Sequence, residues 1–232
     1  MGKRPAQHQQ SRNRHPVLLA LVCILVIAAA VVVLGRVRSA GVAAEDLTRV
    51  LLVAAAPDEN GDVVAQIVAV LDLTASPDSL TPISPATPAT IPGTSYSTIG
   101  DAYPFGGGGA VAAAFARAEK SDPLPYVAVG PDTLAGLLAD MEPVRLTLPA
   151  GMSVFDGERL YTFGRGATSV DASELAAVFK GAPYLSASER AALDAELSEM
   201  LADALAGASP EALATDLSPE ALERLQGALA GR

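Results

Sequence analysis

An uninterrupted apolar run near the N-terminus restricts what this chain can fold into more than any other feature. The 18 residues from Val17 to Leu34 contain no charge, and a helix of that length spans about 27 Å, close to the hydrocarbon thickness of a bilayer. A signal-peptide core is shorter, about 7–15 residues, and Arg36 and Arg38 follow the run directly. We therefore predict an uncleaved transmembrane helix over residues 16–35, with a cleaved signal peptide as the alternative.

The charges beside this run predict its orientation. No acidic residue occurs among the first 44, and four basic residues precede the run: Lys3, Arg4, Arg12 and Arg14. Because basic flanks stay in the cytoplasm, residues 1–15 should form a cytoplasmic tail. Residues 36–48 then serve as a spacer, and residues 49–232 form a domain on the outer side of the membrane. The chain is thus expected to be a single-pass membrane protein with a cytoplasmic N-terminus.

The charge of the predicted outer domain excludes several partners. Ten Lys and Arg residues and all 26 Asp and Glu residues lie beyond Arg38, which gives this part of the chain a net charge of −16. Such a surface repels nucleic acid and anionic lipid headgroups. We therefore expect no nucleic-acid partner, and a polyanionic ligand would need a local basic pocket.

Missing residue types exclude several kinds of catalytic site. Cys23, the only cysteine, lies inside the apolar run, and His8 and His15, the only histidines, lie in the basic tail. The outer domain therefore has no disulfide, no thiol nucleophile, no histidine base and no zinc held by His or Cys. Any chemistry there must use Asp, Glu, Arg, Lys, Ser, Thr or Tyr side chains.

The apolar pattern of the outer domain predicts an α/β fold. Short runs typical of strands occur at 49–56, 62–73, 125–129, 144–148 and 159–165. Helical patterns occur at 108–120, at 131–141 and from 186 onward. Since strands and helices alternate, we predict a mixed central sheet sandwiched by helices. The first two strands could pair directly with each other.

Two further segments have sequences that predict their local structure. Residues 74–97 contain five prolines and many Ser and Thr residues, which predicts an exposed loop or linker. The sequence SPEAL occurs twice, beginning at Ser209 and at Ser218. Ser-Pro-Glu is typical of a helix start, so two short C-terminal helices packed on the domain are expected.

Four consecutive glycines, Gly106 to Gly109, lead directly into an alanine-rich helical pattern. Glycine loops at helix N-termini often bind phosphate. A P-loop, however, also needs a Lys and a Ser or Thr after the glycines, and a dinucleotide fingerprint needs GxGxxG after a strand. Neither pattern is present, so the run by itself predicts a flexible helix entry, with phosphate contact as the alternative.

The order of segments between Thr98 and Gly166 resembles the LytR–CpsA–Psr family. The matching stretches are TIGDAYPFGGGGAVAAAF, PLPYVAVGPDTLAGLLADM, VRLTLPAG and FDGERLYTFGRG. The best single matches are Ala102-Tyr103 with the following glycines, and Asp156-Gly157-Glu158. The resemblance extends to nearly all of residues 49–232, and the predicted membrane anchor agrees with it.

This resemblance implies a LytR–CpsA–Psr-like (LCP-like) domain in a protein of the bacterial cell membrane. Proteins of the family transfer a glycan from a polyprenyl-pyrophosphate carrier to peptidoglycan through a phosphodiester. Basic residues and a carboxylate-bound magnesium ion hold the pyrophosphate, and an apolar cavity takes the lipid chain. Such phosphoryl transfer depends on positioning and on neutralising the developing charge.

The sequence departs from the family pattern at most of the phosphate-binding positions. Arg165 matches the first arginine of the family's RxR motif. Other residues occupy the remaining basic and amide positions: Ala86-Thr87, Thr98, Gly100, Ala167, Glu174 and Ala177. Because arginine–phosphate contacts are strong and neither Ala nor Glu replaces them, we expect pyrophosphate binding to be lost.

Three residues remain as candidate ligands. Arg165 is the candidate phosphate ligand, although it could equally be solvated or paired with Asp171. Asp62 and Asp171 are the candidate metal ligands, because the family's aspartate position falls near Val64 or Ala65, close to Asp62, and because Asp171 matches a second aspartate. No cofactor is predicted from the residues alone, and magnesium is implied only if the protein is an enzyme.

Three functions fit these observations. The first is a membrane-anchored LCP-like protein that binds or regulates in cell-wall glycopolymer metabolism without catalysing transfer, with a polyprenyl-linked glycan or peptidoglycan as its partner. The second is an active phosphotransferase that attaches a glycopolymer to peptidoglycan. The third is an unrelated structural protein of the cell envelope with a Pro/Thr-rich stalk.

Overall fold

A computed structural model describes residues 41–141 and 143–232. The chain divides into two compact units, Met1–Gly41 and Val42–Arg232, and the second contains almost all described residues. The predicted basic tail, the transmembrane helix at 16–35 and the start of the spacer lie outside the described residues. Within the described ranges, no helix is both long enough and apolar enough to cross a membrane.

The centre of the second unit is a five-stranded sheet in the order β3-β2-β1-β4-β9. Its strands are β1 (Arg49–Pro57), β2 (Val63–Asp72), β3 (Ser79–Ile83), β4 (Tyr126–Val129) and β9 (Ala214–Thr215). β1 runs parallel to β4, and the other neighbours are antiparallel. The predicted mixed sheet and the direct pairing of the first two strands are therefore confirmed.

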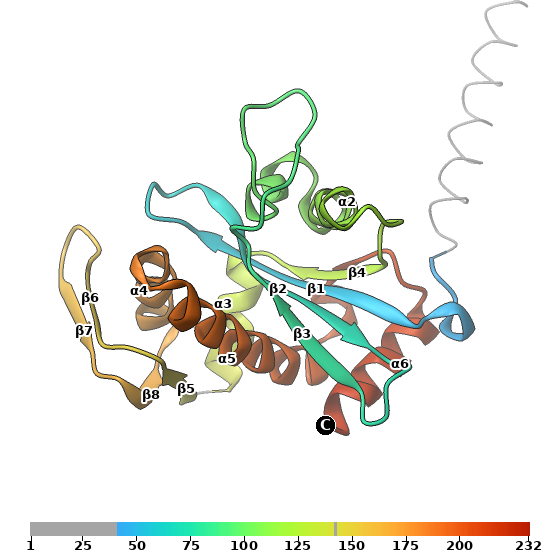
Figure 1. The fold of residues 1–232 in the computed structure, drawn as a ribbon. Coiled ribbons are helices and arrows are strands. Elements are labelled where there is room, and N and C mark those ends of the chain that lie inside the picture. Colours follow the sequence, from blue (N-terminus) through green and yellow to red (C-terminus); the bar gives the residue numbers. More distant parts are fainter. Residues whose placement is uncertain (1–40, 142) are drawn as a thin grey trace, which may run out of the picture. The chain divides into compact units, whose positions relative to one another are not determined.

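Helices cover both faces of this sheet (Figure 1). One face packs against the 3-10 helix η2 (Gly100–Phe105) and α2 (Gly107–Glu119), and the other packs against α5 (Ala187–Ala206). α3 (Pro131–Asp140), α4 (Ala172–Gly181) and α6 (Pro219–Ala230) complete the second layer. Burial on both faces explains why Val50 to Ala56 form a continuous apolar run rather than an alternating one.

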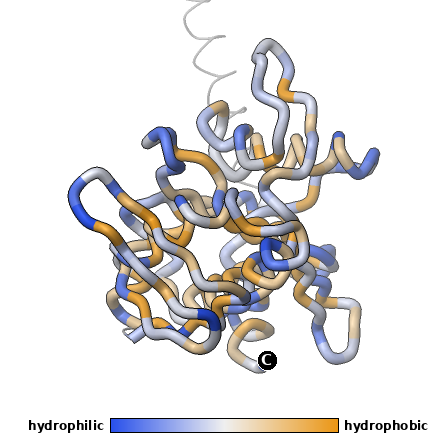
Figure 2. The backbone as a smooth tube through the Cα atoms, turned by 60° about the vertical axis from the view of Figure 1, so that its left-hand side comes forward, coloured by the Kyte–Doolittle hydropathy of each residue, from blue (hydrophilic) through white to orange (hydrophobic). Residues whose placement is uncertain are grey.

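Alternate residues of β1 point into two separate hydrophobic cores. Leu52 and Ala54 belong to the larger core beneath α3 to α6, whereas Leu51 and Val53 belong to the smaller core beneath η2 and α2. Side chains alternate between the faces of a strand, so one apolar run supplies both cores. Hydrophilic residues gather at the outer turns, and hydrophobic ones lie along the inner segments (Figure 2).

Four strands lie outside the central sheet. β5 (Val144–Leu148) pairs with β8 (Gly166–Val170), and β6 (Met152–Phe155) pairs with β7 (Leu160–Phe163). The strands predicted at 144–148 and 159–165 therefore form, but they build two small antiparallel sheets. Short 3-10 helices complete the chain: η1 (Ala44–Asp46), η3 (Ala182–Tyr184) and η4 (Pro210–Ala212).

The structure corrects two local predictions. Residues 74–97 are not only a loop, because β3 forms within them at the edge of the sheet, where a proline such as Pro82 is tolerated. Ser218 starts a helix as predicted, and its hydroxyl accepts the Ala221 N–H at 3.2 Å. Ser209 instead precedes a single 3-10 turn and makes no capping hydrogen bond. Here the chain turns at once into the short strand β9.

Candidate functional site

The three predicted site residues lie on three different segments. Asp62 is in the turn between β1 and β2, Arg165 lies between β7 and β8, and Asp171 directly precedes α4. All three side chains are exposed. Asp62 and Asp171 line two different hollows, and Arg165 lines neither of them. The fold therefore does not assemble these residues into one site.

Asp171 acts as the N-cap of α4. Its Oδ1 accepts hydrogen bonds from the Ser173 hydroxyl at 2.7 Å and from the Glu174 N–H at 2.8 Å. Glu174 accepts the Asp171 N–H in return, which completes a capping box. The Ser173 hydroxyl and then the Glu174 N–H lower the pKa of Asp171. These contacts use one oxygen, Oδ1, of the carboxylate that the sequence suggested as a metal ligand, and give the residue a structural role at the helix start.

Arg165 forms no ion pair with Asp171 or with any other described residue. Its charge acts instead on Glu189, in the first turn of α5. The Ser186 hydroxyl and N–H are the main causes of the lowered pKa of Glu189, and Arg165 contributes less. Arg165 is thus a solvated arginine near the start of α5.

A magnesium site built on Asp62 and Asp171 does not fit this arrangement. Over residues 41–141 and 143–232, no three acidic, histidine or cysteine side chains come close enough together to hold a metal ion. Magnesium needs an octahedral set of oxygen ligands, and these two carboxylates open into separate hollows. No step of the chemistry can be derived through a metal here.

A cavity of about 480 Å³ lies between the β1–β2 turn, the segment before η2, and η2 itself. We call it the aromatic pocket, because Tyr96, Tyr103 and Phe105 line it. Its charged lining residues are all acidic: Asp58, Asp62 and Asp101. No Lys or Arg lines it. The family resemblance assigns the segments near Asp62 and at Thr98 to Tyr103 to the pyrophosphate site. Here these segments surround a negatively charged pocket, whereas a pyrophosphate site should be positively charged.

Local hydrogen bonds position two of these carboxylates. Asp58 Oδ1 accepts the N–H groups of Asn60 at 2.8 Å and of Asp62 at 2.9 Å, which closes the β1–β2 turn. Asp101 Oδ2 accepts the N–H groups of Ser97 and Thr98 at 3.3 and 3.1 Å. Asp58 Oδ2 also accepts the Asn60 side-chain amide at 3.4 Å, whereas Asp101 Oδ1 accepts no hydrogen bond from the described residues and is available to a ligand.

The aromatic walls are unusually exposed for their size. Tyr96 is 50% exposed and Phe105 is 49% exposed, and their ring centroids lie 5.5 Å apart with planes tilted by 54°. Tyr103 lies deeper, and burial raises the pKa of its hydroxyl. The rings therefore form a corner that opens to solvent.

The glycine run connects this pocket to the sheet. α2 begins at Gly107, which has a left-handed φ of 62°, so the predicted helix entry is confirmed. A Cβ on Gly108 would lie only 2.7 Å from the Ala128 Cβ, so the helix approaches β4 closely at this point. Because no Lys or Arg lines the adjoining pocket, the run has no basic partner there for a phosphate.

A second cavity, of about 720 Å³, lies between the end of β3 and the start of α5. We call it the α5 groove. Its walls are mostly apolar, and its charged residues are Arg190 and Asp194, which pair through Nε and Oδ1 at 2.7 Å. Ala86, which occupies a family arginine position, also lines it. Sequence reasoning missed Arg190, and its spacing of four residues from Asp194 on a predicted helix was the available signal.

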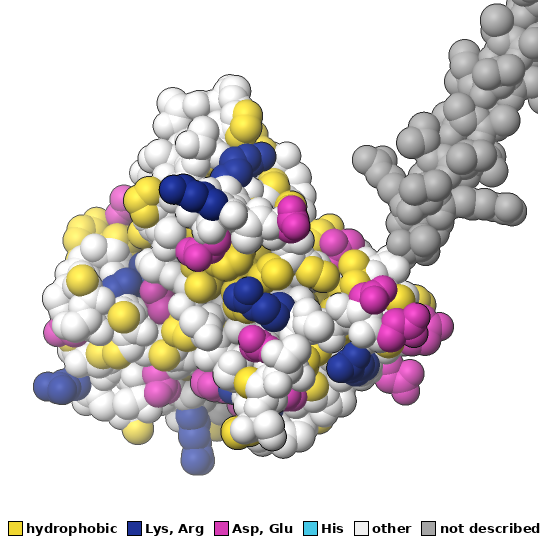
Figure 3. All heavy atoms as spheres, turned by 45° about the vertical axis from the view of Figure 1, so that its right-hand side comes forward, with side chains coloured by type: hydrophobic (Ala, Val, Ile, Leu, Met, Phe, Trp, Pro, Cys, Tyr) yellow, Lys and Arg dark blue, Asp and Glu magenta, His cyan; other side chains and the backbone are white. Residues whose placement is uncertain are grey.

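The face of the domain drawn in Figure 3 shows no basic patch. Lys and Arg side chains are scattered over this face and interspersed with acidic ones (Figure 3). This distribution agrees with the negative net charge of this part of the chain.

Comparisons with known proteins identify the fold. The sequence matches no protein-family model, and no curated protein is significantly similar to it. Among solved structures, B. subtilis TagV matches with a TM-score of 0.55 and 16% identity, over 79% of each chain. A transcriptional regulator (EF0465) from Enterococcus faecalis matches with a TM-score of 0.53 and 17% identity, over 78% of this chain and 70% of that one.

A third structure is TagT bound to LI-WTA. It matches with a TM-score of 0.52 and 14% identity, over 78% of this chain and 74% of that one. At these identities the likeness is one of fold. TagV and TagT are LytR–CpsA–Psr proteins, and the chain therefore has a LytR–CpsA–Psr-like fold.

Proposed function

We propose that this chain is an envelope protein of a bacterial cell membrane that binds a cell-wall glycopolymer without transferring it. In this proposal residues 16–35 anchor the protein, and the domain beyond them lies on the outer side of the membrane. The LytR–CpsA–Psr-like fold and the complex of the similarly folded TagT with LI-WTA support the choice of a glycopolymer as ligand.

One observation favours binding over transfer. The aromatic pocket contains three carboxylates and no cation, and the α5 groove contains a single cation, Arg190, which is already paired with Asp194. Phosphoryl transfer from a pyrophosphate requires several positive charges to neutralise the developing negative charge. The two cavities together offer one partly neutralised arginine, so neither is suited to cleaving a pyrophosphate, and a glycopolymer would be held there through its sugars and not through its phosphates.

The experiment measures transfer and binding separately. The full-length protein in a nonionic detergent is incubated with a polyprenyl-pyrophosphate-linked glycan, peptidoglycan and magnesium, and transfer is followed by release of the lipid carrier. Binding of purified wall teichoic acid to the same protein is followed by calorimetry. We expect binding without turnover. Turnover would instead establish the active phosphotransferase, and its loss or persistence in Arg165→Ala would show whether Arg165 takes part; failure of both assays would remove the glycopolymer role.

A further inference from the structure

We propose that the aromatic pocket binds an organic ammonium group. The relevant chemical class is a quaternary or alkylated amine, which is opposite in charge to the pyrophosphate that the family resemblance implies. This inference goes beyond the proposed function, because it rests on the residues that line the pocket and not on the similarity of fold.

The first argument is the clustering of exposed apolar surface. Six large hydrophobic side chains are exposed in the described part of the chain, and three of them line this pocket: Val63, Tyr96 and Phe105. Large apolar side chains that gather in one concave place, rather than singly over a surface, mark a binding site. The tilted Tyr96 and Phe105 rings present two walls to the same cavity.

The second argument is the electrostatic match to a cation. The faces of aromatic rings carry a negative potential and attract ammonium groups. The only charged residues that line the pocket are Asp58, Asp62 and Asp101, so the rings and the carboxylates both attract a cation. The Asp62 carboxylate and Asp101 Oδ1 accept no hydrogen bond from the described residues, so both can face a cation, whereas both Asp58 oxygens already accept hydrogen bonds within the turn.

The same lining argues against the other classes of ligand. An anion would face three carboxylates without a compensating Lys or Arg. A metal ion requires ligands that converge on one point, and no such group of three is present within the described ranges. A cavity of about 480 Å³ with aromatic walls instead fits a diffuse organic cation, because cation–π contacts do not need a fixed coordination geometry.

The test uses a matched pair of ligands. Choline and its uncharged isostere 3,3-dimethyl-1-butanol are titrated into the full-length protein, in a detergent without choline groups, and followed by calorimetry. We expect choline to bind at least about tenfold more tightly than the isostere, since only choline gains from the rings and the carboxylates. Equal affinity would mean that the pocket recognises apolar shape alone, and would overturn the proposal, as would the absence of choline binding.

Substitutions test whether choline binds in the aromatic pocket. Phe105→Ala and Tyr96→Ala should each weaken choline binding by about tenfold, and Asp62→Asn should weaken it and reduce its dependence on salt. Phe155→Ala and Asp132→Asn are the controls, because both residues are exposed but lie outside the pocket. Binding that persists unchanged in Phe105→Ala would overturn the proposal. Teichoic acid binding is measured in parallel, so that failure here and failure of the glycopolymer role are separate results.

Discussion

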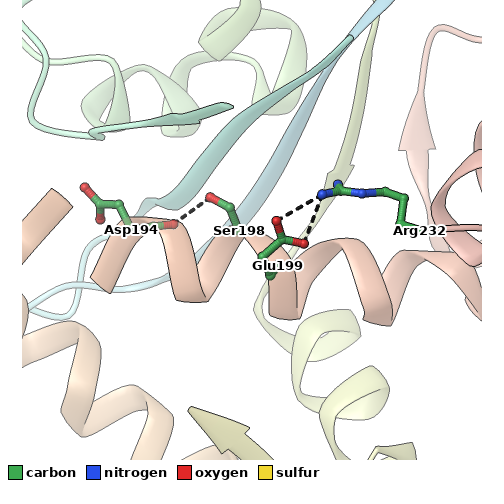
Figure 4. A network of polar contacts seen from close by, with 4 residues as sticks. All are labelled: Asp194, Ser198, Glu199 and Arg232. Atoms are coloured by element: carbon green, nitrogen blue, oxygen red, sulfur yellow. Dashed lines mark hydrogen bonds and ion pairs between the residues drawn. The ribbon is translucent and has the colours of Figure 1, made fainter. Parts of the chain in front are cut away.

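The Arg190 guanidinium donates from Nε to Asp194 Oδ1 at 2.7 Å, one turn apart on α5 and beneath the α5 groove. The side chains are only 17% and 6% exposed. The Ser198 hydroxyl donates to the Asp194 carbonyl oxygen at 2.6 Å, which adds a second contact at this turn (Figure 4). This pair is the most deeply buried polar feature next to either cavity, so it offers a direct test of the packing of α5.

Removal of the arginine should destabilise the fold. Arg190→Ala leaves the Asp194 carboxylate buried without its partner, and we expect a loss of about 2 kcal/mol in the free energy of unfolding. Urea denaturation followed by circular dichroism measures it. Arg232→Ala is the control, because Arg232 is only 20% exposed, like Arg190, but its partner Glu199 is 58% exposed (Figure 4), so the loss leaves no buried charge and should cost at most about 1 kcal/mol. Equal losses in the two variants would contradict a buried role for Arg190.

The stability of the fold should also depend on the ionisation of Asp194. Burial raises the pKa of this carboxyl above its ordinary value of 3.8, and the Arg190 charge opposes the shift. The folded state therefore holds the proton more tightly than the unfolded state. The resulting stabilisation is complete below the unfolded pKa and is lost as the pH rises through the folded pKa.

Asp194→Asn isolates this effect, because it keeps the shape of the side chain and removes the titration. As the pH rises above the ordinary value of 3.8 and through the raised pKa of the folded state, we expect the free energy of unfolding of the wild type to fall relative to that of the variant. Urea titrations of both proteins at each pH measure the difference. Curves that remain parallel would show that Asp194 has similar pKa values in the folded and unfolded states.

The sequence predicted the central layers well because their signals are local. The apolar runs of β1 and β2 and the start of α2 at the glycines are visible in consecutive residues. Long-range contacts decide the rest. β3 forms in a proline-rich segment because it needs to pair with β2 on one edge only. No helix is predicted from the sequence at 172–181, although Asp171 and Glu174 have the spacing of a capping box.

The candidate site was much harder to predict than the fold. Asp62, predicted as a metal ligand, lines a cavity with Tyr96 and Phe105, which come from distant segments and have no common motif. Arg190 appears in the sequence as an ordinary helical residue, and its burial depends on the packing of α5 against the sheet. The sequence does not reveal which side chains share a cavity when they meet only through tertiary packing.

The capping role of Asp171 can be separated from the metal role that the sequence suggested. Asp171→Ala removes the acceptor of the Glu174 N–H and should cost about 1 kcal/mol of stability, whereas Asp171→Asn keeps an acceptor oxygen and should cost less. Thermal unfolding of each variant with and without magnesium measures both effects. We expect no magnesium-dependent shift. A stabilisation by magnesium that vanishes in both variants would assign Asp171 to a metal site instead.

Neighbouring glycines at the start of α2 should respond in opposite directions to the same substitution. In Gly108→Ala the new Cβ would lie 2.7 Å from the Ala128 Cβ and would also meet the Tyr126 ring, so helix and strand must move apart at a cost of about 1–3 kcal/mol. In Gly109→Ala the nearest atom, Tyr126 Cε1, is 3.5 Å away, an ordinary contact. Alanine favours a helix over glycine, so this variant should gain about 0.5 kcal/mol.

Urea denaturation of both glycine variants tests how closely α2 approaches β4. A destabilised Gly108→Ala beside a neutral or stabilised Gly109→Ala would locate the close approach at a single residue. If both substitutions destabilised the protein equally, the loss would reflect a general need for glycine at the helix entry. The pair of measurements therefore separates a close approach at Gly108 from a general need for glycine at this helix start.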